Sequence, residues 1–132
     1  AYTGELGKSK KDLTKLLRGG KINEKSKFID IKLRDKFIFQ NMRFLNAGMD
    51  ISDGLFTDLD KMMHVNNIGI KFYKNIDKKI GCSGEEYEML VSFDKRHKKA
   101  MIRRSKLSRT KLTIFAKAKR VKNIFKCKAN HF

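Results

Sequence analysis

The residues best suited to do chemistry lie in one short stretch, Met49-Asp50-Ile51-Ser52-Asp53-Gly54-Leu55. Its two carboxylates stand three residues apart with a hydroxyl between them. Apolar residues then recur at helical spacing, so we expect the stretch at or just ahead of a helix N-terminus. Free backbone N–H groups there attract phosphate, and nearby carboxylates can hold a hard cation. The residue types and their spacing therefore suit a metal-bound nucleotide.

Two other interpretations of this stretch have to be weighed. Ser52 or Asp53 could be only the N-cap of the helix, with Gly54 easing the turn. A calcium loop of the EF-hand type fits poorly, because the positions that should hold glycine and glutamate hold Leu55 and Lys61. The stretch alone leaves the cap and the metal site open.

The elements that must position the stretch mix helices and strands without a strict βαβ rhythm. This order favours an α+β fold with a mixed sheet, and 132 residues without a repeat or linker suit a single domain. Helical patterns predict helices from Ser9 to the glycines at 19–20 and over 35–46, 55–64 and 94–111, and alternation predicts strands at 29–33, 68–72, 87–93, 112–116 and 123–127.

Positive charge is concentrated in the last third of the chain. Residues 94–132 contain 15 Lys and Arg and one acid, whereas residues 1–93 contain 17 Lys and Arg and 13 acids. Such a block can bind nucleic acid or another polyanion. A compositional bias of the source genome toward lysine would produce the same surface without any partner, so both interpretations stay open.

The two cysteines and the apolar pattern bear on location. Cys82 and Cys127 have neither metal-site spacing nor a disulfide framework, which predicts reduced, partly buried thiols in a cytoplasmic protein. No apolar run is long enough for a transmembrane helix, and no signal peptide is recognisable. Because the chain opens on Ala1 rather than Met, we expect it to be a piece of a longer polypeptide.

Further motifs accompany the acidic stretch in a fixed order. They are the opening Tyr2-Thr3-Gly4-Glu5-Leu6-Gly7-Lys8-Ser9, then Asp58-Leu59, then Ser83-Gly84-Glu85-Glu86-Tyr87-Glu88, and the terminal Asn130-His131-Phe132. Taken together, they resemble the second half of thiamine-monophosphate kinase, a family of the aminoimidazole-ribonucleotide-synthetase-like ATP-binding superfamily. The resemblance covers nearly the whole chain and favours the metal site over the N-cap.

The resemblance implies a reaction and roles for particular residues. The family transfers the γ-phosphate of ATP to thiamine monophosphate with the help of Mg²⁺. By this resemblance, Asp50 and Asp53 would bind Mg²⁺ and Ser52 would contact ATP. Glu85 is the first candidate for the cationic heterocycle of the substrate, and Glu88 is the second. The alternative for Glu88 is a solvated residue on a strand.

Some positions depart from the family pattern. Ala129 stands where the family has an aromatic residue that can stack on the substrate, so that contact is lost or is supplied by Phe132. The Arg-Pro-x-Pro-Arg segment of the family is represented only by Leu33-Arg34-Asp35. The segment between Asp53 and Gly84 is short. These departures concern the thiamine pocket more than the phosphate chemistry.

The resemblance also implies an architecture and partners. We expect residues 1–132 to form one C-terminal domain, a three-layer α/β/α arrangement with a mixed sheet, inactive without the N-terminal ATP- and Mg²⁺-binding domain. A homodimer is expected for the full-length protein. The alternatives are a superfamily enzyme with another phosphate acceptor, or a basic nucleic-acid-binding module on residues 94–132.

Overall fold

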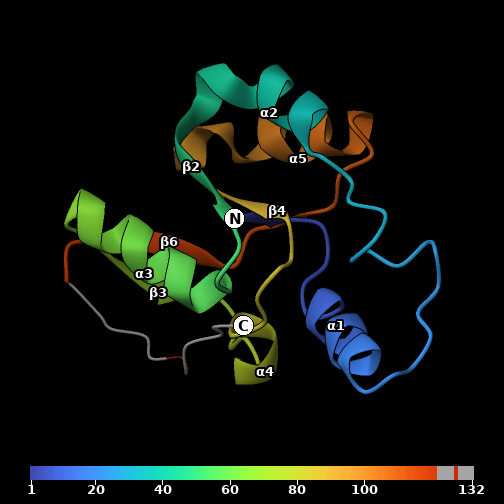
Figure 1. Cartoon of the computed structure of the whole chain (residues 1–132). Helices are drawn as coiled ribbons and strands as arrows, with labels where there is room; N and C mark the ends of the chain where they lie inside the picture. The colour runs from blue at the N-terminus through green and yellow to red at the C-terminus, as the bar shows by residue number, and fades with distance from the viewer. Residues whose placement is uncertain (122–126, 128–132) are drawn as a thin grey trace.

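The structure, a computed structural model, describes residues 1–121 and Cys127 (Figure 1). Helices and strands alternate irregularly along the chain. The strands are β1 (Tyr2–Thr3), β2 (Leu45–Ile51), β3 (Gly69–Phe72), β4 (Glu88–Phe93), β5 (Leu112–Thr113) and β6 (Ala116–Lys119). The α-helices are α1 (Ser9–Leu17), α2 (Asp35–Asn41), α3 (Leu55–Asn66), α4 (Lys78–Gly81) and α5 (Lys98–Leu107), and short 3-10 helices cover Met42–Phe44 and Lys95–His97.

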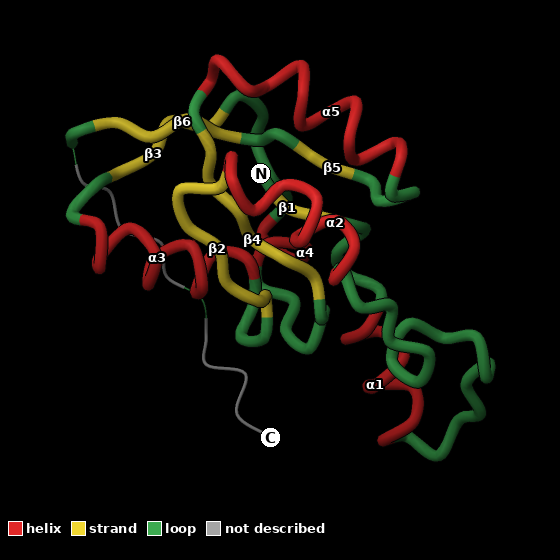
Figure 2. Tube along the Cα trace, turned by 90° about the horizontal axis from the view of Figure 1, so that it is seen from above, coloured by secondary structure: helices red, strands yellow, loops and turns green. Residues whose placement is uncertain are grey.

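The strands form two separate sheets. The larger sheet has the order β2-β4-β1-β5. Among the described strands, β3 pairs with β6 alone, and the two form a separate ribbon (Figure 2). Every pairing among the described strands is antiparallel. The predicted α+β class is confirmed, but the predicted mixed sheet is wrong. The reason is that α3 leads the chain into the β3-β6 ribbon instead of returning it to a parallel place beside β2.

Both faces of the larger sheet are buried. Leu90 and Val91 are neighbours on β4, so their side chains point to opposite faces. Leu90 packs in a core with α3, the β3-β6 ribbon and Phe115. Val91 packs with Phe37 of α2 and Met101 of α5. Helices α2 and α5 lie side by side in Figure 1. The larger sheet therefore lies between α2 and α5 on one face and α3 with the ribbon on the other, which is less regular than the expected three layers.

Most of the predicted elements around the acidic stretch are confirmed. Helices α1, α3 and α5 and strands β3 and β4 form where the patterns placed them. The predicted strand at 112–116 is divided into β5 and β6, and the predicted strand at 123–127 falls almost wholly outside the described residues.

Two predictions upstream of the acidic stretch are wrong. Residues 29–33 form no strand, and their apolar side chains at Ile29, Ile31 and Leu33 are exposed without a partner strand. The helix predicted over 35–46 ends at Asn41, and the chain enters β2 at Leu45. Strand β2 forms because its whole length pairs with β4, a contact that local patterns do not contain.

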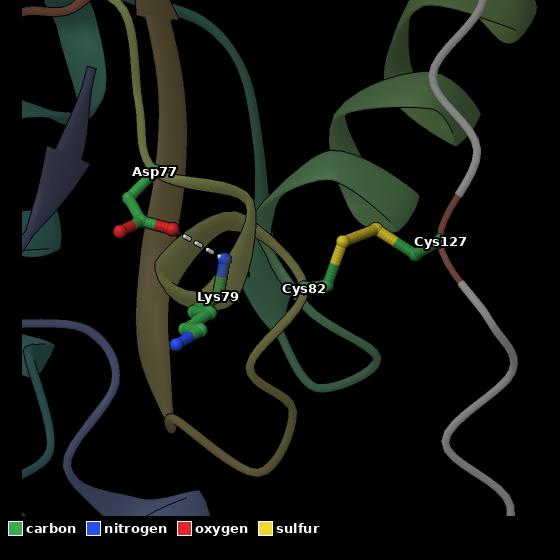
Figure 3. The surroundings of a disulfide bond; sticks show 4 residues. All are labelled: Asp77, Lys79, Cys82 and Cys127. Carbon is green, nitrogen blue, oxygen red and sulfur yellow. Dashed lines mark hydrogen bonds between the residues drawn. A yellow bond between two sulfur atoms is a disulfide. The ribbon is translucent and has the colours of Figure 1, made fainter.

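The prediction of reduced thiols is also wrong. Cys82, which follows α4, forms a disulfide with Cys127, and their Cα atoms are 5.7 Å apart (Figure 3). A separation in this range is what a disulfide requires. The pairing depends on the folded path of the chain, and a sequence separation of 45 residues gives no hint of it. Within the described part of the chain, no helix is both long and apolar enough to cross a membrane.

Candidate functional site

The predicted metal ligands lie where β2 passes into α3. Strand β2 ends at Ile51 and α3 begins at Leu55, so residues 52–54 form a short loop. We call residues 50–54 the acidic loop. Asp50 is exposed near the end of β2, opposite Met89 of β4, and the Asp53 side chain is 53% exposed. Both carboxylates can therefore be reached by a ligand from solvent.

A buried carboxylate shapes the acidic loop. Asp58 lies in the first turn of α3 with no exposed surface. Its Oδ2 atom accepts the backbone N–H groups of Ser52 and Asp53, each at 3.0 Å. The N-cap of α3 is Gly54, so the interpretation of Ser52 or Asp53 as the N-cap is wrong. Asp58 fixes the loop backbone and leaves the Ser52 and Asp53 side chains for other contacts.

Lys61 of α3 neutralises part of the negative charge. Its Nζ lies 2.5 Å from Asp53 Oδ2 and 2.9 Å from Asp58 Oδ1. Hydrogen bonds to Asp53 and Asp58 raise the pKa of Lys61, so it carries its charge throughout the physiological range. A cation that binds Asp53 must therefore share or displace Lys61.

The motif Ser83-Gly84-Glu85-Glu86-Tyr87-Glu88 lies directly against the acidic loop. The Glu85 N–H donates to the Ser52 carbonyl at 2.7 Å, and the Tyr87 N–H donates to the Ile51 carbonyl at 3.3 Å. Glu85 and Tyr87 both have positive φ, 57° and 53°. Just before the motif, the backbone of Cys82 lies close to Gly54, where a Cβ would lie 3.2 Å from the Cys82 carbonyl carbon. Two motifs far apart in the sequence thus form one continuous surface.

The Glu85 carboxylate lies at the edge of this surface. It is half-buried, and Tyr87 donates its hydroxyl to Oε2 at 2.5 Å. This hydrogen bond raises the pKa of Tyr87. Glu85 is therefore held in place by a neighbour while still reachable, as a contact for a cationic group requires.

Glu88, the second predicted substrate contact, has a different environment. It is buried, and its carboxylate accepts from Thr3 Oγ1 at 2.7 Å and from Arg34 Nε and Nη2 at 2.8 Å each, with Lys27 Nζ at 3.0 Å. The alternative of a solvated strand residue is wrong. Burial would raise the pKa of Glu88, but Arg34, Thr3 and Lys27 together lower it below its ordinary value.

The opening motif packs on the same carboxylate. Gly4 has φ 64°, and a Cβ at this position would lie 1.8 Å from Glu88 Oε1. Two residues before Glu88, buried Glu86 accepts the Gly7 N–H at 2.6 Å and the Ser83 hydroxyl at 2.5 Å. The two glycines of the opening motif therefore serve contacts with the two buried glutamates.

Sequence reasoning missed three residues that build these surroundings. The sequence predicts Asp58 only as part of a motif, and it predicts no role for Thr3 or Lys27. The one available signal was the position of Asp58, a carboxylate in the first turn of a predicted helix. Ala129 and Phe132, the predicted aromatic position and its substitute, lie outside the described residues.

The fit of the acidic loop to a metal ion is partial. Within the described residues, no group of three or more His, Cys, Asp and Glu side chains is arranged to hold one. Mg²⁺ is commonly bound through one or two carboxylates, with water and substrate phosphates completing its coordination. Asp50 and Asp53 fit that mode of binding and do not make a complete protein cage.

Known proteins are similar to this chain in part of its sequence and in its fold. No protein-family model matches the sequence. The thiamine-monophosphate kinase of Nitrosopumilus maritimus (strain SCM1) is 32% identical over an alignment of 92 residues, and the match covers 60% of this chain and 30% of that protein.

Solved structures share the fold. AaThiL complexed with AMPPCP and TMP superposes with a TM-score of 0.72 at 20% identity, covering 94% of this chain and 46% of that one. The thiamine-monophosphate kinase from Stenotrophomonas maltophilia K279a gives a TM-score of 0.74 at 16% identity, covering 93% of this chain and 48% of that one. The chain thus corresponds to less than half of the length of these relatives.

Proposed function

We propose that this chain, which folds as a thiamine-monophosphate-kinase-like domain, is the C-terminal half of an ATP- and Mg²⁺-dependent kinase of thiamine monophosphate. The observation that carries the proposal is the junction between the acidic loop and the Ser83-Gly84-Glu85-Glu86-Tyr87-Glu88 motif, made by the hydrogen bond from Glu85 N–H to the Ser52 carbonyl. The binding of AMPPCP, an ATP analogue, and TMP by AaThiL supports the choice of substrates.

Each end of this junction has a distinct task in the proposal. Asp50 and Asp53 would hold Mg²⁺, and the Ser52 hydroxyl would contact ATP. Glu85 faces the cationic heterocycle of thiamine, where a carboxylate held by Tyr87 offers a fixed counter-charge. Bound Mg²⁺ supplies charge neutralisation on the phosphate oxygens.

The residues of this chain mainly position and neutralise. The acceptor is itself an ionised phosphate, so the transfer needs no strong general base, and we assign none. Asp58 keeps the acidic loop in one backbone conformation, which limits the reorganisation needed when ligands bind. Lys61 pairs with Asp53, and a divalent cation held by Asp53 would compete with this ion pair.

Other parts of the proposal extend beyond the chain. We propose that residues 1–132 are one domain that is inactive alone, that an N-terminal domain supplies further ATP and Mg²⁺ ligands, and that the full-length protein is a homodimer. A cytoplasmic location agrees with the use of ATP. Disulfides such as Cys82–Cys127 are uncommon in cytoplasmic proteins outside hyperthermophiles.

The test is turnover by the natural polypeptide that carries this chain. ADP release is followed with ATP, Mg²⁺ and thiamine monophosphate in the wild type, in Asp53→Asn and in Asp60→Asn, a matched change on α3 outside the acidic loop. We expect Asp53→Asn to lose about 100-fold or more in turnover, because a metal-ligand charge contributes several kcal/mol. We expect Asp60→Asn to stay near wild type.

Other outcomes would change the assignment. ADP release that does not depend on thiamine monophosphate would keep the superfamily and replace the acceptor. Equal losses in the Asp53 and Asp60 variants would remove the metal role of the acidic loop. Turnover by the 132-residue chain alone would contradict the need for an N-terminal domain.

A further inference from the structure

A second charged site lies apart from the carboxylates of the acidic loop. A cleft with a volume of about 410 Å³ opens between the start of the chain, the 25–34 segment and the turn after α5. Ten of the eleven residues that line it are charged, and seven of them are Lys or Arg. We call it the basic cleft and define it by Lys25, Lys27, Lys32, Arg34, Arg109 and Lys111.

The inner wall of the basic cleft is rigidly built. Glu88, only 1% exposed, pairs with Arg34 at 2.8 Å and with Lys27 at 3.0 Å. The side chains of Lys27 and Arg34 are 18% and 16% exposed, so both are held at the surface of the cleft. Lys27 also lies 3.3 Å from the buried carboxylate of Glu86, so two cations are held by two buried carboxylates. The excess of positive charge in the cleft therefore comes from the cations at its rim.

Three cations at the rim of the cleft are not neutralised. Lys25, Lys32 and Arg109 are exposed, and in the part of the chain that the structure describes none of them forms an ion pair with a carboxylate. Arg109 is held by its backbone, which has φ 51° and donates its N–H to the Lys106 carbonyl at 3.0 Å. Like charges collected in a concave site favour the binding of an anion.

The side of the cleft around Glu5 adds to the excess of positive charge. Lys111 lies 3.4 Å from Glu5, and Lys8 pairs with the same carboxylate. The pKa of Glu5 is lowered by both lysines, first by Lys8, so Glu5 stays charged. Two cations here share one carboxylate, and the cleft carries seven basic groups against three acidic ones.

We propose that the basic cleft binds the phosphate chain of a small polyanion. Its volume suits a ligand of about nucleotide size or smaller. Phosphate oxygens match Lys and Arg donors, and Arg can bind them with two parallel hydrogen bonds. None of the described residues that line the cleft is aromatic. They offer no platform for stacked bases, and this disfavours single-stranded nucleic acid. The proposal is independent of the proposed kinase reaction.

The test measures binding without Mg²⁺ or thiamine monophosphate. Inorganic tripolyphosphate and ATP are each titrated into the 132-residue chain by calorimetry at about 0.15 M salt, where weak surface attraction is screened. The cleft variant combines Lys25→Gln, Lys32→Gln and Arg109→Gln. A matched control combines Lys99→Gln, Arg103→Gln and Lys106→Gln, which remove the same charge from exposed positions on α5.

We expect the cleft variant to bind tripolyphosphate about tenfold or more weakly, because charge-assisted contacts are lost, and the control to stay within about twofold. Thermal unfolding of both variants checks that they fold. ATP and tripolyphosphate binding equally would identify the phosphate chain as the whole ligand, whereas tighter ATP binding would add the nucleoside, and both results support the site.

Three results would overturn the proposal. Equal losses in the two variants would show attraction to net charge alone. Absence of measurable tripolyphosphate binding to the wild type would remove the site. Preferential binding of a single-stranded oligonucleotide, lost in the α5 control, would assign the basic surface to nucleic acid.

Discussion

At the scale of single residues, Glu88 joins more of the chain than any local pattern suggests. Its carboxylate contacts Thr3 of β1 and Arg34 and Lys27 of the irregular segment before α2, and it leaves no room for a Cβ at Gly4. Because these partners lie far apart in the sequence, one side chain ties the opening motif to β4. Its role in the described structure is to position the surroundings of the site.

We predict that Glu88→Gln lowers the free energy of unfolding by about 2–3 kcal/mol at neutral pH, because Arg34 and Lys27 lose a buried counter-charge. The measurement is the urea midpoint. Glu24→Gln, a change at an exposed glutamate, is the control and should shift the free energy by less than about 0.5 kcal/mol.

The stabilisation by Glu88, measured as the difference between the wild type and Glu88→Gln, should depend on pH. The folded pKa of Glu88 lies below its ordinary value of 4.5, so its contribution is present above pH 4.5 and is lost as the pH falls through the folded pKa. The difference in stability between the wild type and Glu88→Gln should therefore shrink in acid. A difference that stays constant down to acid unfolding would contradict the assigned cause.

At the scale of elements, the site depends on how β2 enters α3. The last residues of β2 pair with β4, and the first turn of α3 supplies Asp58 to hold the backbone between them. Negative charge near a helix N-terminus is also favourable for the helix dipole. Strand, loop and helix thus present the acidic loop in a single conformation.

We predict that Asp58→Ala lowers the free energy of unfolding by about 2 kcal/mol, since two backbone N–H groups lose their acceptor. If the acidic loop binds Mg²⁺, the affinity should fall in the same variant although Asp50 and Asp53 remain. Chemical unfolding and a Mg²⁺ titration in the presence of ATP measure the two effects. Asp60→Ala is the control, and a matching loss there would contradict a specific role for Asp58.

The elements differ in how far the sequence predicts them. Helix α3 carries its own apolar face, and β4 contains the short apolar run Met89-Leu90-Val91 followed by Phe93, so both are predictable. Strand β2 also alternates, from Leu45 through Ala47 and Met49 to Ile51, but Leu45 fits the helical face of the preceding segment equally well. Only the pairing with β4 decides between the two, and that pairing is a long-range contact.

At the scale of the whole molecule, the contacts that join the motifs could not be predicted from local patterns. The resemblance of the motifs indicated which stretches belong together. It gave neither the hydrogen bond between Glu85 and Ser52 nor the burial of Glu88, because both follow from the register of β2 on β4. The disulfide also depends on a long-range contact, because the path of the folded chain brings Cys82 to Cys127.

We predict that reducing the Cys82–Cys127 disulfide lowers the free energy of unfolding by about 2–4 kcal/mol, because the bond restricts a long loop in the unfolded chain. The measurement compares denaturant midpoints with and without a dithiol reductant. A variant with both Cys82→Ser and Cys127→Ser should resemble the reduced protein and be insensitive to the reductant. An unchanged wild-type midpoint under reduction would contradict the contribution of the bond.

The place of β1 in the larger sheet has a consequence for biosynthesis. Tyr2 pairs with Leu90 on one side and with Thr113 on the other, so the earliest of these residues to leave the ribosome needs two of the latest as neighbours. At bacterial or eukaryotic elongation rates, the wait lasts about 5–20 s. Until Leu90 is synthesised β1 has neither partner strand, and its unpaired backbone groups are open to pairing with another chain.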